Sequence, residues 1–249
     1  FAITKNDVTQ HIVQGVPLGL QFSVLAVGII VMQAGVVRFD MRGAAMVSNA
    51  AQNGFGAANK LNNLIMTPMN AFGGAMTSFT AQNLGAGHYD RIKRGSLQAL
   101  GIVSILAALS VGLGLLAMRN DFFYHIFLSA DKVTAETMRY GNALLYVDFA
   151  LYLFLAFIFV VRNCVQGIGR SGFVLGAGGA ELAARVAACL LLPTAIAGGA
   201  VSVDAPPLAF YALCVADPLA WIAADAVLCY PFFRNILKSD YGYLRQGSA

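Results

Sequence analysis

Six long, mostly apolar stretches recur along this 249-residue chain, and short polar segments separate them. An α-helix needs about 20 apolar residues to cross the hydrocarbon core of a bilayer, and each of the six stretches reaches that length. Because the bilayer core offers no water to the backbone, such stretches cross it as helices. The sequence therefore predicts an all-α fold, a polytopic membrane protein whose six transmembrane helices form one bundle over residues 1–249. The predicted spans lie near 12–37, 54–82, 95–118, 141–166, 172–198 and 207–234.

The composition agrees with a membrane location and excludes other classes of protein. Charged residues make up 11% of the chain, whereas soluble domains carry about 25%. The net charge of +4 is small and dispersed, so we expect contact with membrane lipid and no binding to nucleic acid. The first residue is Phe1 and no signal peptide precedes the first span, so we expect a fragment or a processed half of a longer protein.

Lysine and arginine are distributed unequally between the two sides of the predicted bundle. One side holds nine and the other holds five, together with most of the acidic loop residues. By the positive-inside rule the richer side is cytoplasmic, and so are both termini. On the poorer, outer side, residues 131–140 predict a short surface helix with Asp131 as its N-cap. The nine are Lys5, Arg91, Lys93, Arg94, Arg162, Arg170, Arg234, Lys238 and Arg245.

Charged residues inside the spans are the first candidates for function, because each costs about 2.5–3.5 kcal/mol there and needs a partner or a watery cavity. Glu181 and Arg185 are four residues apart, so they share a helix face and can pair, either for packing alone or as part of a pathway. Asp217 lies beside Pro218, and we expect it to be a solvent-exposed residue at a helix end. Asp225 is deeper, and its role is open.

Lys60 and Asp148 carry two open alternatives each. Lys60 has no acidic residue at helical spacing in its own span, so we expect it to meet Asp148, Glu181, Asp225 or a carbonyl group of another helix, or to line an aqueous path. Asp148 lies in an aromatic-rich stretch and is a candidate proton- or cation-responsive group. If it paired with Lys60, it would be a structural partner instead.

Uncharged polar side chains and prolines add to the candidates. Gln21 in the first span, and Asn59 and Asn63 in the second, can either bond across helices or line a cavity for a ligand. Pro17 and Pro68, in the same two spans, each remove an intrahelical hydrogen bond and favour kinks, which suit a bundle that moves.

No constellation for catalysis or for a cofactor is visible in the sequence. His11, His88 and His125 are isolated, and no Cys/His cluster has metal-ligand spacing. A phosphate-binding loop and a Ser/His nucleophile arrangement are likewise missing. An intramembrane aspartic enzyme would need two carboxylates brought together, for which Asp148 and Asp225 are the candidate pair. We expect no catalytic residue, no metal, no cofactor and no enzyme activity.

A glycine-punctuated segment with three cations joins the second and third predicted spans. It reads Ala81-Gln82-Asn83-Leu84-Gly85-Ala86-Gly87-His88-Tyr89-Asp90-Arg91-Ile92-Lys93-Arg94-Gly95. This segment resembles the loop that joins two helices in each lobe of multidrug and toxin extrusion (MATE) transporters. Two upstream strings, Gly54-Phe55-Gly56-Ala57-Ala58-Asn59-Lys60-Leu61 and Met66-Thr67-Pro68-Met69, strengthen the resemblance. The family-motif residues, which we call the motif hinge, are Pro17, Pro68, Gln82, Asn83, Gly85, Gly87, Arg91 and Gly95.

The whole chain resembles the C-terminal half of a bacterial MATE transporter, with six of the usual twelve helices. The resemblance implies an antiporter in the bacterial plasma membrane, in which two six-helix lobes enclose a central cavity and inward flow of H⁺ or Na⁺ drives export of small, often cationic and amphipathic compounds. Its partner would be an N-terminal six-helix lobe that is missing from this chain. Sodium-coupled members carry a glutamate where 22–26 has no acid, and an aspartate that would fall near Leu155, two turns after Asp148. The segment between Arg38 and Asn53 is also longer than is usual in the family.

Two other functions stay open on the sequence alone. A lipid-linked oligosaccharide flippase of the same superfamily would need a strongly cationic cavity, which Lys60 and Arg185 alone scarcely provide. The other alternative is a six-helix membrane protein that transports nothing and dimerises through its glycine-rich faces.

Overall fold

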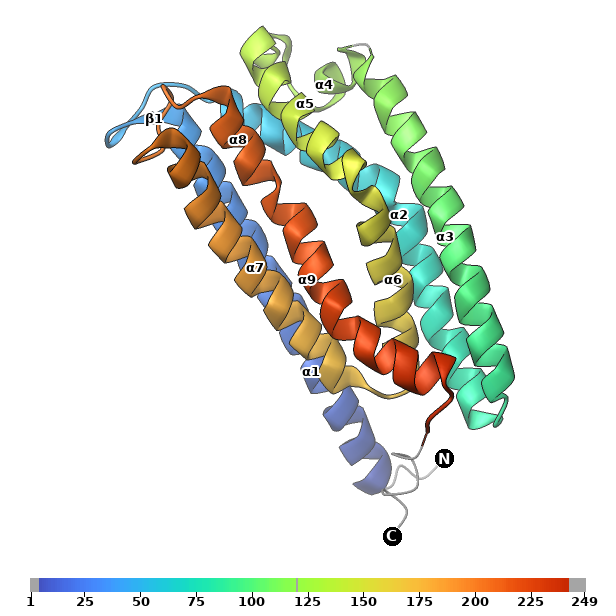
Figure 1. Cartoon of the computed structure of the whole chain (residues 1–249). Coiled ribbons are helices and arrows are strands. Elements are labelled where there is room, and N and C mark those ends of the chain that lie inside the picture. The colour runs from blue at the N-terminus through green and yellow to red at the C-terminus, as the bar shows by residue number, and fades with distance from the viewer. Residues whose placement is uncertain (1–4, 120, 242–249) are drawn as a thin grey trace.

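The computed structural model describes residues 5–119 and 121–241, and this part of the chain is almost entirely helical (Figure 1). Arg245 lies outside the described residues. Besides the α-helices, the described elements are the short turns η1 (Arg38–Asp40), η2 (Ala130–Lys132) and η3 (Phe232–Leu237), and the hairpin strands β1 (Met41–Arg42) and β2 (Ala45–Met46). The helices are α1 (Lys5–Val37), α2 (Ala50–Gly85), α3 (Tyr89–Met118), α4 (Phe122–Phe127), α5 (Ala135–Ala150), α6 (Tyr152–Gly167), α7 (Ser171–Ala197), α8 (Pro207–Cys214) and α9 (Ala216–Pro231).

Several helical stretches are long and apolar enough to cross a bilayer. Four single helical stretches meet both conditions, at His11–Asp40, Tyr89–Met118, Ser171–Ala197 and Pro207–Leu237. The bent pair α5 and α6 makes a fifth if it is counted as one span. α2 is 36 residues long, but its Asn and Gln side chains and Lys60 lower its hydropathy. The prediction of an all-α polytopic membrane protein is confirmed, and the number of six spans stays a prediction.

Two of the predicted spans are broken into separate helices. In the stretch 141–166, α5 ends and α6 begins at Leu151, where the two axes differ by 59°. In the stretch 207–234, α8 ends at Cys214, because Pro218 has no amide hydrogen to bond to the Cys214 carbonyl group. After Pro231 the chain continues as the π-helical turn η3.

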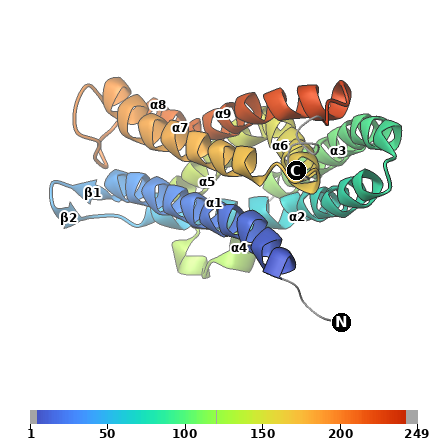
Figure 2. The same ribbon diagram turned by 90° about the horizontal axis from the view of Figure 1, so that it is seen from below.

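The helices form two groups that meet along one seam. α1 packs along α7, and α7 packs along α8 and α9, whereas α2 packs against α3, α5 and α6. The contact of α6 with α9 joins the groups (Figure 2). We call the end of the bundle with β1 and β2 the hairpin end, and the opposite end, which holds the first and last described residues, the terminal end (Figure 1).

Asp40 holds the start of α2. Its side chain is fully buried, and its two carboxylate oxygens accept the N–H groups of Ala51 and Gln52 at 3.0 and 2.9 Å. Amides in the first turn of a helix lack partners within the helix, and the helix dipole favours a negative charge there. The long segment between Arg38 and Asn53 therefore contains a small hairpin, β1 and β2, and Asp40, which caps α2.

A clasp at the hairpin end, formed by Met41, Arg42, Val203 and Asp204, joins the loop after α1 to the loop after α7. Arg42 donates from Nη2 and Nε to the Asp204 carboxylate at 2.7 and 3.0 Å, and the Val203 N–H group donates to the Met41 carbonyl oxygen at 2.9 Å. Hydrogen bonding to Arg42 lowers the pKa of the Asp204 carboxyl. The ion pair is thus present at neutral pH and is lost as the pH falls through that lowered pKa.

The prediction of a surface helix over 131–140 capped by Asp131 was wrong. Asp131 lies in η2, and α5 begins only at Ala135. Thr134 is the N-cap, because its hydroxyl oxygen accepts the N–H group of Thr137 at 3.1 Å. The segment that lies across this end is α4, whose Tyr124 hydroxyl donates to Asn142 Oδ1 at 2.9 Å.

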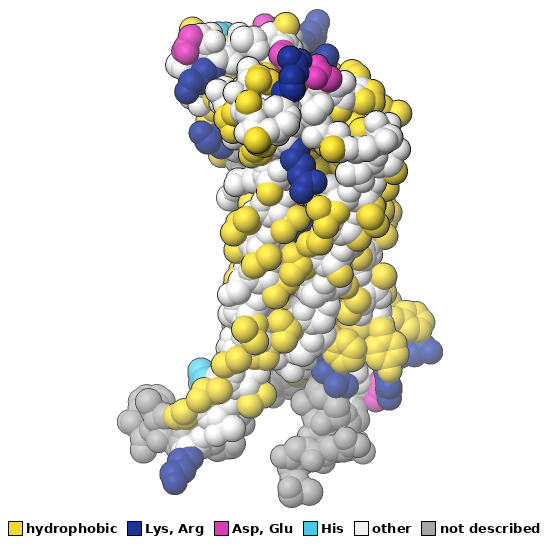
Figure 3. Space-filling model, turned by 90° about the vertical axis from the view of Figure 1, so that its left-hand side faces the viewer, with side chains coloured by type: hydrophobic (Ala, Val, Ile, Leu, Met, Phe, Trp, Pro, Cys, Tyr) yellow, Lys and Arg dark blue, Asp and Glu magenta, His cyan; other side chains and the backbone are white. Residues whose placement is uncertain are grey.

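Large apolar side chains cover much of the outside of the bundle. Ile30 on α1 is 65% exposed, and Ile105, Leu109 and Leu116 on α3 are similarly open. Figure 3 shows hydrophobic side chains along the middle of one face, with most of the visible charged side chains toward its two ends. Such a surface is stable in contact with lipid or with further protein.

α2 approaches its neighbours most closely at glycines. A Cβ atom on Gly73 would lie 2.7 Å from the Phe159 carbonyl oxygen and 2.7 Å from Asn163 Nδ2, both on α6. A Cβ atom on Gly74, the next residue, would meet no described atom within 4 Å. Only a residue without a side chain fits at Gly73, whereas Gly74 tolerates one.

We expect Gly73→Ala to destabilise the protein by about 1–3 kcal/mol, because the added methyl group forces α2 and α6 apart. Gly74→Ala is the matched control, and it should be neutral or stabilising, since Ala is favoured over Gly in a helix by up to roughly 1 kcal/mol. Thermal unfolding of the two variants in detergent measures the difference. Equal melting temperatures would contradict the close contact at Gly73.

Candidate functional site

α2 presents a polar stripe on its exposed face. The stripe residues recur at helical spacing, so they lie on one side of the helix, and all are exposed. Exposed polar side chains in the middle of a membrane helix do not suit lipid, and they favour contact with water or with another part of a protein. We call this set the polar stripe: Lys60, Asn63, Thr67, Asn70, Ser78 and Gln82.

Lys60 does not pair with Asp148, so the alternative in which Asp148 is a structural partner of Lys60 is excluded. Lys60 lies in the polar stripe, and its Nζ atom is 5.7 Å from the ring centroid of Phe127 on α4. α4 lies at the hairpin end (Figure 1). A long lysine side chain can direct its ammonium group toward such an end while its stem covers apolar surface. Because Lys60 is exposed, the alternative that it lines an aqueous path remains a prediction.

Asp148 is buried where α5 meets α6, with 1% of its surface exposed. Asn62, on the buried side of α2, donates from Nδ2 to Asp148 Oδ2 at 2.9 Å. Among the described residues, Asp148 Oδ1, Asn62 Oδ1 and the Tyr152 hydroxyl group are buried without a hydrogen-bond partner. Tyr152 lies one turn after Asp148, across the break at Leu151. Oxygen atoms of this kind, with one carboxylate among them, are suited to a proton or a hard cation such as Na⁺.

The other amide candidates lie in different surroundings. Gln21 is buried between α1 and α7, where a Cβ atom on Gly178 would lie 3.0 Å from its Cγ atom. Asn59 is half-buried, and Asn63 belongs to the polar stripe. The structure therefore brings neither Gln21 nor Asn63 to Asp148, and the partner that it does bring is Asn62.

Four charged side chains form a buried chain across three helices. Arg162 on α6 donates from Nη2 to Glu181 Oε2 on α7 at 2.6 Å, and Arg185 Nη2 lies 3.4 Å from Glu181 Oε1. Arg185 then donates from Nε to Asp217 Oδ1 on α9 at 2.9 Å. We call Arg162, Glu181, Arg185 and Asp217 the charged chain. Gly28 on α1 makes room for it, since a Cβ atom there would lie 2.8 Å from Arg185 Nη1.

The charged chain confirms one prediction and corrects two. Glu181 and Arg185 pair as their spacing predicts. Asp217 is not a wet residue, because its side chain is 17% exposed and bonded to Arg185. Arg162 is not a surface cation, because its side chain is 15% exposed and bonded to Glu181. Asp148 lies on α5, which contacts α9, the helix that carries Asp217.

Several residues of the motif hinge have local structural roles at the turn between α2 and α3. The Ala86 and His88 N–H groups donate to the carbonyl oxygens of Gln82 and Asn83 at 3.1 and 2.8 Å, which closes the end of α2. Gly87 has a φ angle of +72°, in the left-handed region that favours glycine. A Cβ atom on Gly95 would collide with the Phe79 ring, so this glycine lets α3 lie against α2.

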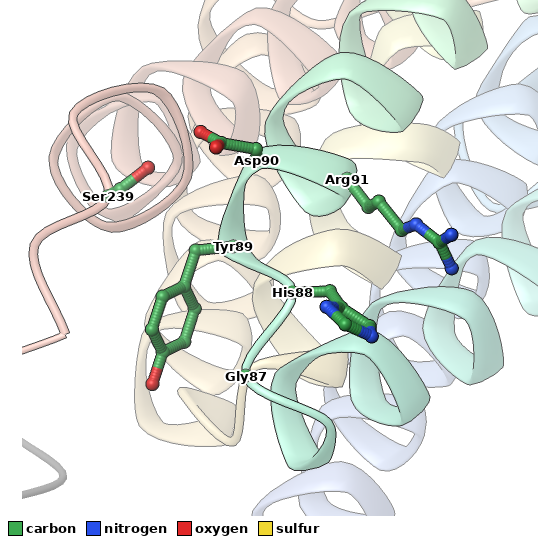
Figure 4. A pocket seen from close by; sticks show the side chains of 6 residues that line it. All are labelled: Gly87, His88, Tyr89, Asp90, Arg91 and Ser239. Atoms are coloured by element: carbon green, nitrogen blue, oxygen red, sulfur yellow. The ribbon is translucent and has the colours of Figure 1, made fainter.

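A hollow lies next to the motif hinge at the terminal end. Figure 4 shows Tyr89 and Asp90 on the side of Ser239, and His88 and Arg91 turned away from it. The Tyr89 ring stacks on Tyr241, with 4.5 Å between the centroids. Because these side chains do not converge, the hollow is a weaker candidate than Asp148 and the charged chain. Within the described residues, no three His, Cys, Asp or Glu side chains come together as metal ligands would.

Comparison with known protein families decides what kind of protein carries these features. A model of the MatE family matches residues 23–197, well over half of the chain. The chain belongs to the MatE family. Members of this family are transporters and not enzymes, so this MatE protein is a multi-pass membrane transport protein. No curated protein and no solved structure gave a match.

The matched region contains α2, Asp148, Glu181 and Arg185, and it ends at Ala197. Asp217 and Asp225 lie beyond it on α9. The sequence reasoning missed Asn62 and Arg162 as members of the site. Asn62 differs from its neighbour Asn63 only in the side of the helix on which it lies, and Arg162 becomes a partner only through the packing of α6 on α7.

Proposed function

We propose that this chain is one six-helix lobe of a MATE antiporter, which exports drugs or other amphipathic organic compounds in exchange for H⁺ or Na⁺. The observation that carries the proposal is the exposed polar stripe on α2, backed by the buried Asp148 through Asn62. The stripe supplies one wall of a watery cavity for the exported compound. Asp148 supplies a carboxylate for the coupling ion.

In this proposal α2 links the compound to the ion. Asn63 faces the cavity, and the adjacent Asn62 bonds to Asp148 on the opposite side of the same helix. A proton or Na⁺ at Asp148 competes with the bond from Asn62, so binding of the ion changes how α2 is held against α5. Pro68 and the break at Leu151 are the places where these helices bend most readily. Ion and compound then favour different arrangements, as alternating access requires.

A second six-helix lobe would form the other wall of the cavity. Support comes from the exposed polar stripe and the exposed apolar side of α1, both of which a second lobe would cover. The lysine and arginine residues that gather at the terminal end support a cytoplasmic location for that end, in a bacterial plasma membrane.

The flippase alternative receives less support. Arg185 is engaged by Glu181 and Asp217, so it adds no free positive charge to a cavity. Lys60 is then the charged member of the polar stripe. A single cation fits an anionic lipid-linked sugar poorly, since such a substrate carries its charge on phosphate groups that are bound best by several cations.

The test is efflux by the chain in cells that lack their own pumps. Expressed alone, the chain should give no resistance to ethidium or norfloxacin, because half of the cavity is absent. Expressed with a second lobe, it should restore resistance, and Asn63→Leu with Thr67→Val should weaken it, whereas Leu109→Ala on the lipid-facing side of α3 should not. Full resistance from the chain alone would favour a homodimer, and movement of a lipid-linked oligosaccharide without drug exchange would favour the flippase.

A further inference from the structure

Asp225 on α9 carries a carboxylate whose surroundings leave it unsatisfied. Both of its oxygens are buried, and neither has a hydrogen-bond partner among the described residues. It lies about two turns after Asp217 on the same helix, and the charges that act on it come from Arg162 on α6 and Glu181 on α7. A buried carboxylate that is ionised and unpaired is costly, so its charge calls for a counter-ion or a proton.

The charged chain does not supply that counter-ion. It contains two guanidinium groups and two carboxylates, so it is neutral without Asp225. The other charged groups on elements that pack against α9, at their ends and on α9 itself are Arg185 on α7, Arg170 just before α7, Arg234 on η3, Glu136, Arg139 and Asp148 on α5, and Asp217, and the titratable thiols there include Cys189, Cys214 and Cys229. Arg185 is bonded to Glu181 and Asp217, and Arg234 to Asp240.

Arg162 has an unused edge, and its helix α6 packs against α9, which carries Asp225. It donates to Glu181 through Nη2, while its Nε atom is buried without a hydrogen-bond partner in the described part of the chain. A guanidinium group has five donors in a planar fork, so it can serve two carboxylates in turn. One donor of Arg162 and two acceptors of Asp225 are thus unsatisfied on two helices that pack together, and no hydrogen bond joins them.

We propose that Asp225 is a second monovalent-cation site, which holds a proton or Na⁺ in the conformation described here. When the cation leaves, the uncompensated carboxylate attracts Arg162, whose Nε edge bonds to it and whose bond to Glu181 loosens. The cation on Asp225 thereby controls the contact between α6 and α7. The site is separate from Asp148, which lies on α5 and bonds to α2.

Cation binding to the purified protein tests this proposal without any transport. The melting temperature is measured in NaCl and in choline chloride at equal ionic strength over a range of pH. The infrared band of protonated carboxylic acids is followed over the same range. The variants are Asp225→Asn, Asp225→Glu and, as a matched control, the exposed Asp131→Asn. Each is also made in an Asp148→Asn background, which removes the other buried carboxylate.

If the cation is Na⁺, NaCl should raise the melting temperature over choline chloride, and Asp225→Asn should abolish this rise. If it is a proton, a protonated-carboxyl band should titrate with pH and vanish in Asp225→Asn. Asp225→Glu should keep the response with a shifted midpoint. This variant still tests the site if Asp225→Asn folds poorly. Asp131→Asn should match the wild type. A response of wild-type size in Asp225→Asn, an unshifted midpoint in Asp225→Glu, or no response in the wild type would overturn the proposal. Cation binding at Asp225 does not depend on export. Absence of the expected response therefore contradicts the Asp225 site, whereas absence of export contradicts the antiport function.

Discussion

Glu181→Gln is expected to destabilise the protein by about 3–5 kcal/mol, because it leaves buried positive charge uncompensated. Glu181 is 6% exposed, and it accepts hydrogen bonds from both Arg162 and Arg185, at 2.6 and 3.4 Å. Unfolding of the detergent-solubilised variant by heat or denaturant measures the loss. Glu136→Gln is the control, because Glu136 is an exposed acid whose pairing with Arg139 contributes little.

Double variants separate the members of the charged chain. Glu181→Gln with Arg162→Gln leaves the bond between Arg185 and Asp217 intact, so it should recover much of the lost stability. Glu181→Gln with Arg185→Gln leaves Arg162 and Asp217 buried without partners, so it should recover less. Strictly additive losses in both cycles would show that these side chains do not interact.

Asp148→Asn is expected to reduce drug-driven ion exchange about tenfold or more while the protein stays folded and inserted. An amide cannot take up a proton or hold Na⁺ as a carboxylate does, and a hydrogen bond to a charged group is worth about 1.5–3 kcal/mol, which is roughly 10- to 150-fold in a rate or affinity. The measurement is flux of protons or Na⁺, on addition of drug, into vesicles that hold the chain together with the proposed second lobe.

Lys60→Ala supplies the matched comparison for Asp148. Because Lys60 lies in the polar stripe and Asp148 bonds to Asn62, removal of the lysine should leave the pH dependence of exchange unchanged. Asp148→Glu should retain part of the activity. Wild-type flux and an unaltered pH profile in Asp148→Asn would reduce Asp148 to a structural partner of Asn62.

The sequence predicts interactions that are local along a helix much better than those between helices. The pairing of Glu181 with Arg185 follows from a spacing of four residues, and the structure confirms it. The sequence places Arg162 and Asp217 at the membrane surface, because both lie near the ends of apolar stretches. Their burial depends on how α6 and α9 cross α7, which no spacing within one stretch reveals.

The broken spans show a related limit. The break before α9 has a local cause in Pro218, whose residue type alone suggests it. The 59° bend at Leu151 has no proline or glycine beside it, and hydropathy continues through it. At this bend the Leu151 N–H group bonds to the Asp148 carbonyl oxygen at 3.1 Å, one residue short of the α-helical pattern. Asp148 is thus placed at a bend that the apolar pattern conceals.

The clasp, together with Asp40, restrains the bundle at the hairpin end. It ties the loop after α1 to the loop after α7, and Asp40 ties the same region to the start of α2. Three long helices are therefore joined near one point, and because α1 also packs along α7, these two can move only together against α2. The 33 residues of α1 place its far tip about 50 Å from that joint, at about 1.5 Å per residue. A tilt of about 5° at the clasp would move this tip by about 4 Å, so the largest displacements belong to the terminal end.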